Sequence, residues 1–119
     1  MPRVVHFDIS AGNPNELMKF YESVFGWKFS RWEGPMEYWM IQTGEGPGID
    51  GGLSKKSPQS MDINTIDVPN LDDYVKKVQE NGGIIIVPKM AIPGIGWHAI
   101  FKDSAGNIFG MMQNDPNAK

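Results

Sequence analysis

The sequence predicts an α+β domain built from two βαβββ modules, and three observations support this prediction. Asn13 and Asn70 each begin a helical pattern that follows a predicted strand. The glycines that end these helices, Gly26 and Gly83, have the same separation along the chain as the two asparagines, which indicates an internal repeat. The chain has 119 residues, of which 40% are hydrophobic, which is enough for one domain with a buried core.

A single βαβββ module leaves one sheet face exposed and its edge strands unpaired. We therefore expect the two copies to combine into one curved eight-stranded sheet with both helices on its convex side. The concave side would then form a cleft, which is the natural place for a ligand.

The first module is expected over residues 3–53. Residues 4–9 alternate apolar and polar side chains, which is typical of a strand. Asn13 follows as an N-cap, with Pro14 at the first helical position and Glu16 placed for a capping box. Apolar residues at helical spacing continue until a glycine stops the helix. Three further strands are predicted at residues 27–32, 37–42 and 49–53.

The second module is expected over residues 61–113, after a polar linker at residues 54–60. Asn70 is its N-cap, and two glycines end its helix. Residues 84–88 are apolar throughout, which favours a strand buried on both faces or nearly so. Residues 114–119 are polar and are expected to fray. The remaining strands of this module are predicted at residues 62–68, 96–102 and 108–113.

Composition excludes several classes of partner. The net charge is −3 and the basic residues are scattered, so the chain has no basic surface for nucleic acid. No apolar run approaches the roughly 20 residues that span a bilayer, and no signal peptide is visible, so no membrane partner is expected. Cysteine is absent, which excludes disulfides and thiolate sites and fits a cytoplasmic protein.

His6 is the leading candidate for a functional residue. It lies in the middle of the first predicted strand, on the face expected to line the cleft, and the repeat places Ile63 at the equivalent position of the second module. An imidazole with a pKa near the ordinary value of about 6.5 can act as an acid, a base or a hydrogen-bond partner. A satisfied interior histidine is an equally good interpretation. Asp8 faces the same way, although alternate strand positions are spaced too widely to favour a direct bond to His6.

Met40 and Trp97 are related by the same repeat offset, so we expect them at paired positions in the two modules. They would either line the cleft or fill the core. His98 has no carboxylate at ligand spacing, which favours a place at the surface or rim. Trp32 and Trp39 belong to an unusually aromatic first module, which favours a pocket or an interface.

Several segments resemble one known superfamily: residues 4–9, 20–21, 25–27, 48–53, 101–103 and 106–108. They are similar to the vicinal oxygen chelate superfamily, which includes glyoxalase I, bleomycin-resistance proteins and extradiol dioxygenases. The resemblance covers roughly residues 3–113 and is closest to small glyoxalase-related proteins of unassigned substrate. It implies a small-molecule ligand or substrate in the cleft and a homodimer.

The metalloenzymes of that superfamily take ligands from the first and last strands of each module. His6 matches one such position, whereas Ile63 and Gly110 stand at two others and cannot bind a metal. Asp50 is the only carboxylate near the last strand of the first module. A catalytic divalent ion needs about three protein donors, so no metal is expected. The glycines of residues 46–51 precede a strand rather than a helix, so no dinucleotide cofactor is expected either.

Three hypotheses follow. The first is a metal-independent protein that binds a small molecule in a cleft lined by His6, Asp8, Met40, Trp97, Gly110 and Met112. The second is a lyase or isomerase related to glyoxalase I, in which His6 is the catalytic acid–base group or the lone anchor of a metal. The third is an interaction module that uses its sheet only to dimerise.

Overall fold

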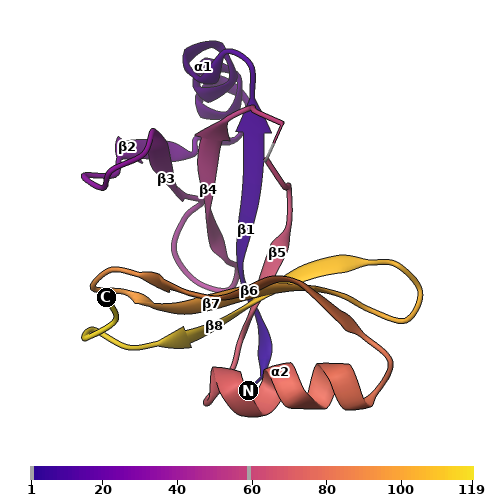
Figure 1. Ribbon diagram of the computed structural model, residues 1–119. Coiled ribbons are helices and arrows are strands. Elements are labelled where there is room, and N and C mark those ends of the chain that lie inside the picture. The colour runs from indigo at the N-terminus through magenta and orange to yellow at the C-terminus, as the bar shows by residue number, and fades with distance from the viewer. Residues whose placement is uncertain (1, 59) are drawn as a thin grey trace. The chain divides into compact units, whose positions relative to one another are not determined.

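The computed structural model describes residues 2–58 and 60–119. Over these residues the chain forms eight strands and two helices, in the order β1 α1 β2 β3 β4 β5 α2 β6 β7 β8. The strands follow the order β2-β3-β4-β1-β5-β8-β7-β6 in a mixed sheet (Figure 1). The predicted α+β class, with two βαβββ repeats and an eight-stranded sheet, is confirmed. Within the part of the chain that the structure describes, no helix has the length and apolar character needed to cross a membrane.

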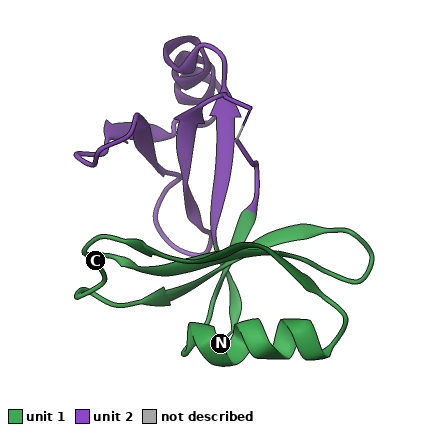
Figure 2. Ribbon diagram, in the orientation of Figure 1, with its two compact units in different colours: residues 1–5, 64–119 green, residues 6–63 purple. Residues whose placement is uncertain are grey.

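The chain divides into two compact units, coloured separately in Figure 2. Unit 2 is His6–Ile63, and unit 1 consists of Met1–Val5 together with Asn64–Lys119. The division falls inside β1 (Arg3–Ala11), so the start of this strand belongs to unit 1. Unit 2 therefore carries nearly all of the first repeat, and unit 1 carries the second.

Local signals fix the helix of unit 2. The Asn13 side chain accepts a hydrogen bond from the backbone N–H of Glu16 at 3.2 Å, as the capping-box pattern predicts. Gly26 ends the helix with a φ of 71°, a left-handed conformation that favours glycine. β4 continues through Lys55, so the predicted linker loses its first two residues to the strand. The elements of this unit are β1, α1 (Pro14–Phe25), β2 (Lys28–Arg31), β3 (Tyr38–Gln42) and β4 (Asp50–Lys55).

The apolar side of unit 2 is aromatic. The Tyr21 ring on α1 stacks on Trp27 with centroids 4.7 Å apart, and Phe7 on β1 lies 5.7 Å from Trp27. Ile41 and Leu53 are 1% and 0% exposed. Because successive strand residues point to opposite faces, the contacts of Phe7 with the α1 side place its neighbours in β1 on the other face.

Unit 1 repeats the helix signals. Asn70 caps α2 by accepting a hydrogen bond from the backbone N–H of Asp73 at 3.0 Å. Gly82, with a φ of 91°, and the hydrogen bond from Gly83 N–H to the Val78 carbonyl end the helix, as predicted. The elements of this unit are β5 (Asn64–Asp67), α2 (Leu71–Glu80), β6 (Ile84–Ile92), β7 (Gly96–Lys102) and β8 (Ile108–Asn114).

The core of unit 1 lies between α2 and its strands. Four residues form its buried centre: Val68, Leu71, Ala99 and Met111. Tyr74, Val75 and Val78 of α2 pack against this centre, as do Trp97 and Phe101 of β7. The apolar residues of α2, which follow helical spacing, therefore face the sheet.

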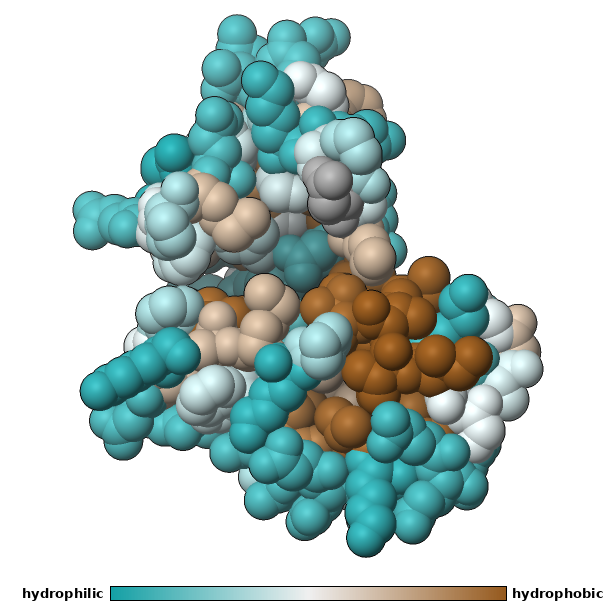
Figure 3. Space-filling view, in the orientation of Figure 1, coloured by the Kyte–Doolittle hydropathy of each residue, from teal (hydrophilic) through white to brown (hydrophobic). Residues whose placement is uncertain are grey.

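β6 is an edge strand, which corrects the prediction that residues 84–88 are buried on both faces. β6 stands at one end of the strand order, and Ile84 at its start is 62% exposed. Pro88 lacks an N–H, and the register with β7 shifts on either side of Val87, as is usual for an edge. Figure 3 shows apolar side chains at the surface of this unit, over its strands next to α2.

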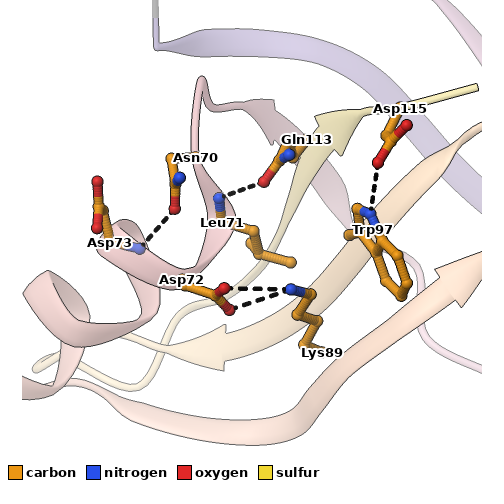
Figure 4. A network of polar contacts seen from close by, with 8 residues as sticks. All are labelled: Asn70, Leu71, Asp72, Asp73, Lys89, Trp97, Gln113 and Asp115. Carbon is orange, nitrogen blue, oxygen red and sulfur yellow. Dashed lines mark hydrogen bonds and ion pairs between the residues drawn. The ribbon is translucent and has the colours of Figure 1, made fainter. Parts of the chain in front are cut away.

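The C-terminal segment is anchored, so the prediction that residues 114–119 fray is wrong. The carbonyl of Ala118 accepts a hydrogen bond from Gly94 N–H at 3.0 Å, and Ala118 is only 3% exposed. The backbone N–H of Asp115 donates to the Ile95 carbonyl at 2.9 Å. The indole N–H of Trp97 donates to Asp115 at 3.0 Å (Figure 4).

A polar network joins α2 to the strands (Figure 4). The Lys89 ammonium lies 3.2 Å from Asp72 and 4.8 Å from the centre of the Trp97 ring. The side-chain carbonyl of Gln113 accepts a hydrogen bond from the backbone N–H of Leu71 at 2.8 Å. The first turn of α2 is therefore held by β6 and β8, far along the chain from the helix itself.

Candidate functional site

The face of β1 opposite α1 presents His6 and Asp8. In the parallel pairing of β1 with β4, His6 stands opposite Asp50 and Asp8 opposite Gly52. Tyr38 begins β3, the strand on the far side of β4. Three adjacent strands of unit 2 thus contribute to one polar face.

His6, Asp8 and Tyr38 form a hydrogen-bonded cluster. The Tyr38 hydroxyl donates to Asp8 Oδ1 at 2.7 Å. His6 Nε2 lies 3.0 Å from the Tyr38 oxygen and 3.3 Å from the same carboxylate oxygen. Contrary to the expectation from strand spacing, His6 and Asp8 are in direct contact, and both side chains also contact the Tyr38 hydroxyl. The side chains of His6 and Asp8 remain 36% and 25% exposed.

Tyr38 acts as a hydrogen-bond donor in this cluster. Its burial, followed by the charge of Asp8 and the hydrogen bond to it, raises the pKa of Tyr38 far above the ordinary value of about 10. The hydroxyl therefore keeps its proton throughout the neutral range. The sequence pattern places Tyr38 in a strand but does not reveal its contact with Asp8, because that contact joins residues 30 positions apart.

Gly52 makes room for Tyr38. A Cβ atom built on Gly52 would overlap the hydroxyl oxygen and the ring of Tyr38. No other residue type can stand at position 52 while Tyr38 keeps this place. The cluster thus depends on a glycine in β4 as much as on its own polar groups.

Asp50 is engaged at the base of the glycine-rich loop. Its Oδ1 accepts hydrogen bonds from the backbone N–H of Thr43 at 2.9 Å and from the Thr43 hydroxyl at 3.1 Å. The Thr43 hydroxyl also lies 2.7 Å from the Ile49 carbonyl. Asp50 therefore closes the β3–β4 loop through its hydrogen bonds to Thr43. It stands opposite His6 in the pairing of β1 with β4.

Unit 1 contains the equivalent of this site. The parallel pairing of β5 with β8 sets Thr65 opposite Gly110, as β1 and β4 set Asp8 opposite Gly52. His98 pairs two residues beyond Gly110, as Tyr38 pairs two residues beyond Gly52. Threonine replaces the carboxylate in unit 1, and histidine replaces the tyrosine.

His98 covers Gly110 as Tyr38 covers Gly52. His98 Nε2 lies 3.4 Å from the Thr65 hydroxyl, and Thr65 is only 2% exposed. A Cβ atom at Gly110 would lie 2.7 Å from His98 Nε2 and 2.9 Å from the Thr65 hydroxyl. His98 is half-buried rather than fully at the surface. Met112, half-buried, shares this face because it is two residues from Gly110 in β8.

The expected equivalence of Met40 and Trp97 is wrong. Met40 pairs with Gly52, whereas the residue that pairs with Gly110 is Ile100. The repeat offset changes because β6, at 9 residues, is longer than β2, at 4 residues. Met40 is 45% exposed and lies on the same face as Tyr38, two residues away.

Trp97 and His98 point to opposite faces of β7. Trp97 packs against the core beneath α2, together with Ala99 and Phe101. Alternation then places His98 on the face of Gly110 and Met112. Of the six residues predicted to line a cleft, the structure groups His6, Asp8 and Met40 in unit 2 and Gly110 and Met112 in unit 1, and it places Trp97 in the core of unit 1. Their contact with a ligand stays a prediction.

Of the positions at which the superfamily's metalloenzymes bind their ion, only His6 carries a donor side chain. The strand register makes Gly52 the equivalent of Gly110 in the first module. Ile63, 8% exposed, has no donor atom, and Gly52 and Gly110 have no side chain. A carboxylate side chain at either glycine would collide with the ring that covers it. Among residues 2–58 and 60–119, no group of three or more His, Asp or Glu side chains is arranged to hold a metal ion.

Residues 3–111 match the model of the Glyoxalase/Bleomycin resistance protein/Dioxygenase superfamily. A comparison with curated protein sequences gave no significant match. Several solved structures have the same fold at low sequence identity. A hypothetical protein from Bacillus halodurans is similar with a TM-score of 0.75 and 17% identity, over 98% of this chain and 97% of that chain.

Two further structures are of methylmalonyl-CoA epimerases. The Mycobacterium tuberculosis enzyme is similar with a TM-score of 0.74 and 13% identity, over 95% of this chain and 88% of that chain. A variant of the Streptomyces coelicolor enzyme, in complex with 2-nitronate-propionyl-CoA, is similar with a TM-score of 0.70 and 12% identity, over 100% of this chain and 99% of that chain. At these identities the similarity shows the fold alone.

Proposed function

Because the chain belongs to the Glyoxalase/Bleomycin resistance protein/Dioxygenase superfamily, we propose that it binds a small organic molecule beside His6 without a metal ion. The observation that carries this proposal is the position of the Tyr38 hydroxyl. It occupies the space above Gly52, where a metal-binding side chain would have to project. The hydrogen-bonded side chains of His6, Asp8 and Tyr38 stand where a metal ion would otherwise lie.

The polar face of β1, β3 and β4 supplies the chemistry of such a site. His6 and Asp8 are partly exposed, so they are open to a ligand while already held by Tyr38. A preorganised polar group loses little freedom on binding, which favours affinity. Met40, exposed on the same face, adds an apolar and adaptable contact.

A binding screen tests this function. Protein treated with a chelator is examined by thermal shift against aromatic and amphipathic compounds, and hits are measured by calorimetry. We expect hits that survive chelation and that bind at least about tenfold more weakly to His6→Ala, a loss of about 1.4 kcal/mol. His98→Ala is the matched control for a histidine on the equivalent strand face of unit 1. Stoichiometric zinc, nickel or iron in protein purified without chelator would contradict metal independence.

An enzymatic function is the alternative, and the contact between His6 and Asp8 favours it. A carboxylate hydrogen-bonded to an imidazole holds the ring in one orientation, as general acid–base catalysis requires. The reaction would be that of a lyase or isomerase related to glyoxalase I, with His6 as the acid–base group. Turnover of any substrate that is unchanged in His6→Ala would rule this role out.

The superfamily resemblance also supports a homodimer. Light scattering after size-exclusion chromatography would then give twice the chain mass of 13.3 kDa. A single-chain mass at high micromolar concentration would exclude a stable dimer.

A further inference from the structure

The direction of one hydrogen bond constrains the whole His6 cluster. A phenol carries a single hydroxyl proton. Tyr38 donates that proton to Asp8 Oδ1 at 2.7 Å, the shortest contact of the three. The Tyr38 oxygen therefore faces His6 only as an acceptor.

Two acceptors then face one ring nitrogen of His6. Nε2 lies 3.0 Å from the Tyr38 oxygen and 3.3 Å from Asp8 Oδ1. A lone pair on Nε2 would point at both oxygens and repel them, whereas an N–H can be shared between them. Neutral imidazole has one N–H, so placing it on Nε2 leaves the lone pair on Nδ1.

Nδ1 is open to solvent. Within the described residues, no hydrogen bond involves this atom, since every contact of the ring is made through Nε2. In the same part of the chain, no buried side-chain nitrogen or oxygen lacks a partner. An unpaired Nδ1 on a half-buried residue must therefore be reached by water, and a ligand can reach it in the same way.

We infer that neutral His6 is held as the Nε2–H tautomer and presents Nδ1 as a hydrogen-bond acceptor, so that the molecule bound beside it carries a hydroxyl or N–H donor. Tyr38 is a positioning residue in this arrangement, because it acts through His6. The tautomer is a property of the free protein, whereas the ligand class rests on the proposed function.

Unit 1 supplies a natural comparison within the same chain. His98 Nε2 faces the Thr65 hydroxyl at 3.4 Å. A threonine hydroxyl can donate or accept, so this contact does not select a tautomer. The chain has two histidines, which makes the two ring systems easy to assign separately.

Nitrogen NMR of the uniformly ¹⁵N-labelled free protein tests the tautomer. Spectra are recorded at about pH 9, well above the ordinary histidine pKa of about 6.5. We expect His6 Nδ1 at the shift of an unprotonated ring nitrogen and Nε2 at that of an N–H, with His6→Gln removing these signals. A protonated Nδ1, or an even mixture of tautomers, would overturn the assignment.

Tyr38→Phe tests what holds the ring. Removing the hydroxyl takes away the closer acceptor and frees Asp8, so the His6 signals should move toward a tautomer mixture while the His98 signals stay in place. Folding of the variant is checked from the dispersion of its backbone spectrum, and Asp8→Asn serves as the second variant. If both variants keep pure Nε2–H, Tyr38 and Asp8 do not set the tautomer.

Phenol and anisole test the ligand class, because they share one ring and only phenol carries a donor. Each is titrated into the labelled protein over the same millimolar range. Phenol should shift the His6 Nδ1 signal at least about fivefold more than anisole does. Equal shifts, or no shift with either probe, would contradict a donor-bearing ligand at Nδ1. The tautomer result would still stand in that case, so the two failures are distinguishable.

Discussion

Units 1 and 2 build the same backbone arrangement and place different chemistry on it. In both, a residue of the first strand stands opposite a glycine of the last strand, and a ring from the neighbouring strand covers that glycine. Unit 2 uses Asp8 and Tyr38, a carboxylate and a donor to it at 2.7 Å. Unit 1 uses Thr65 and His98, two groups without a fixed charge, at 3.4 Å. The strand register preserves the site's geometry, and two side chains decide its polarity.

The largest expected effect on the free energy of unfolding comes from adding a side chain at Gly52 or Gly110. Gly52→Ala should lower the free energy of unfolding by about 3 kcal/mol, because the new Cβ overlaps Tyr38 directly, whereas Gly110→Ala should cost about 1–2 kcal/mol. Denaturant unfolding measures both. Gly12→Ala is the control, since a Cβ there meets no atom within 4 Å. Equal losses at the two glycines would show that Tyr38 and His98 are equally easy to displace.

Removing the Tyr38 hydroxyl from unit 2 and the Thr65 hydroxyl from unit 1 should give the next largest difference in the free energy of unfolding. Tyr38→Phe keeps the ring but leaves Asp8 and His6 without their common partner, which should cost about 1–2 kcal/mol. Thr65→Val removes a longer contact and should cost about 0.5–1 kcal/mol. Both values come from denaturant unfolding at pH 7. A larger loss for Thr65→Val would reverse the ranking of the two polar clusters.

Removing the N-cap of each helix should change the free energy of unfolding by a similar amount in the two units. Asn13→Ala and Asn70→Ala each remove one bond from a side chain to a backbone N–H, at 3.2 and 3.0 Å, and each should cost about 1 kcal/mol. Asn→Asp at either position keeps an acceptor and is the control. A difference of more than about 1 kcal/mol between the two alanine variants would mean that the repeats are not equivalent in their helices either.

The smallest expected effect is a pH dependence confined to unit 1. The hydrogen bond from the Trp97 indole, then that from the Asn117 backbone, holds the pKa of Asp115 below its ordinary value, and the Lys89 charge adds to this. A depressed carboxyl pKa contributes stability above the unfolded value of about 3.9, and this is lost as the pH falls further. Asp115→Asn should therefore flatten the fall in melting temperature between about pH 5 and pH 3. An unchanged slope would mean that this bond does not survive in solution.

The local part of the fold was predictable from the sequence, and the contacts across strands were not. Asn13 and Asn70 cap helices through residues three positions away, so the pattern itself contains the interaction. Tyr38 reaches Asp8 only once β3, β4 and β1 are in register, and no spacing rule encodes that register. The burial of Ala118 likewise depends on a turn more than twenty positions earlier in the chain.

The same limit explains the errors at β6 and at Trp97. Five consecutive apolar residues indicate burial, but whether a strand is central or at an edge depends on the strand order. The repeat offset holds in the first strands and helices and fails after the longer β6, which misplaced Trp97. A constant repeat offset identifies equivalent residues only until an element differs in length between the two modules, as β6 and β2 do.

The covered glycines have an evolutionary consequence. A lineage that carries Tyr38 over Gly52, or His98 over Gly110, cannot gain a carboxylate at that glycine by one substitution, because the new side chain collides with the ring before it can be useful. The residue that covers the glycine must first be replaced by a smaller one. In unit 2 this first substitution removes the Tyr38 hydroxyl, which is the hydrogen-bond partner of His6 and Asp8. The gain of a carboxylate at either glycine would therefore pass through a less stable intermediate, and the side chain that must change first differs between the two units.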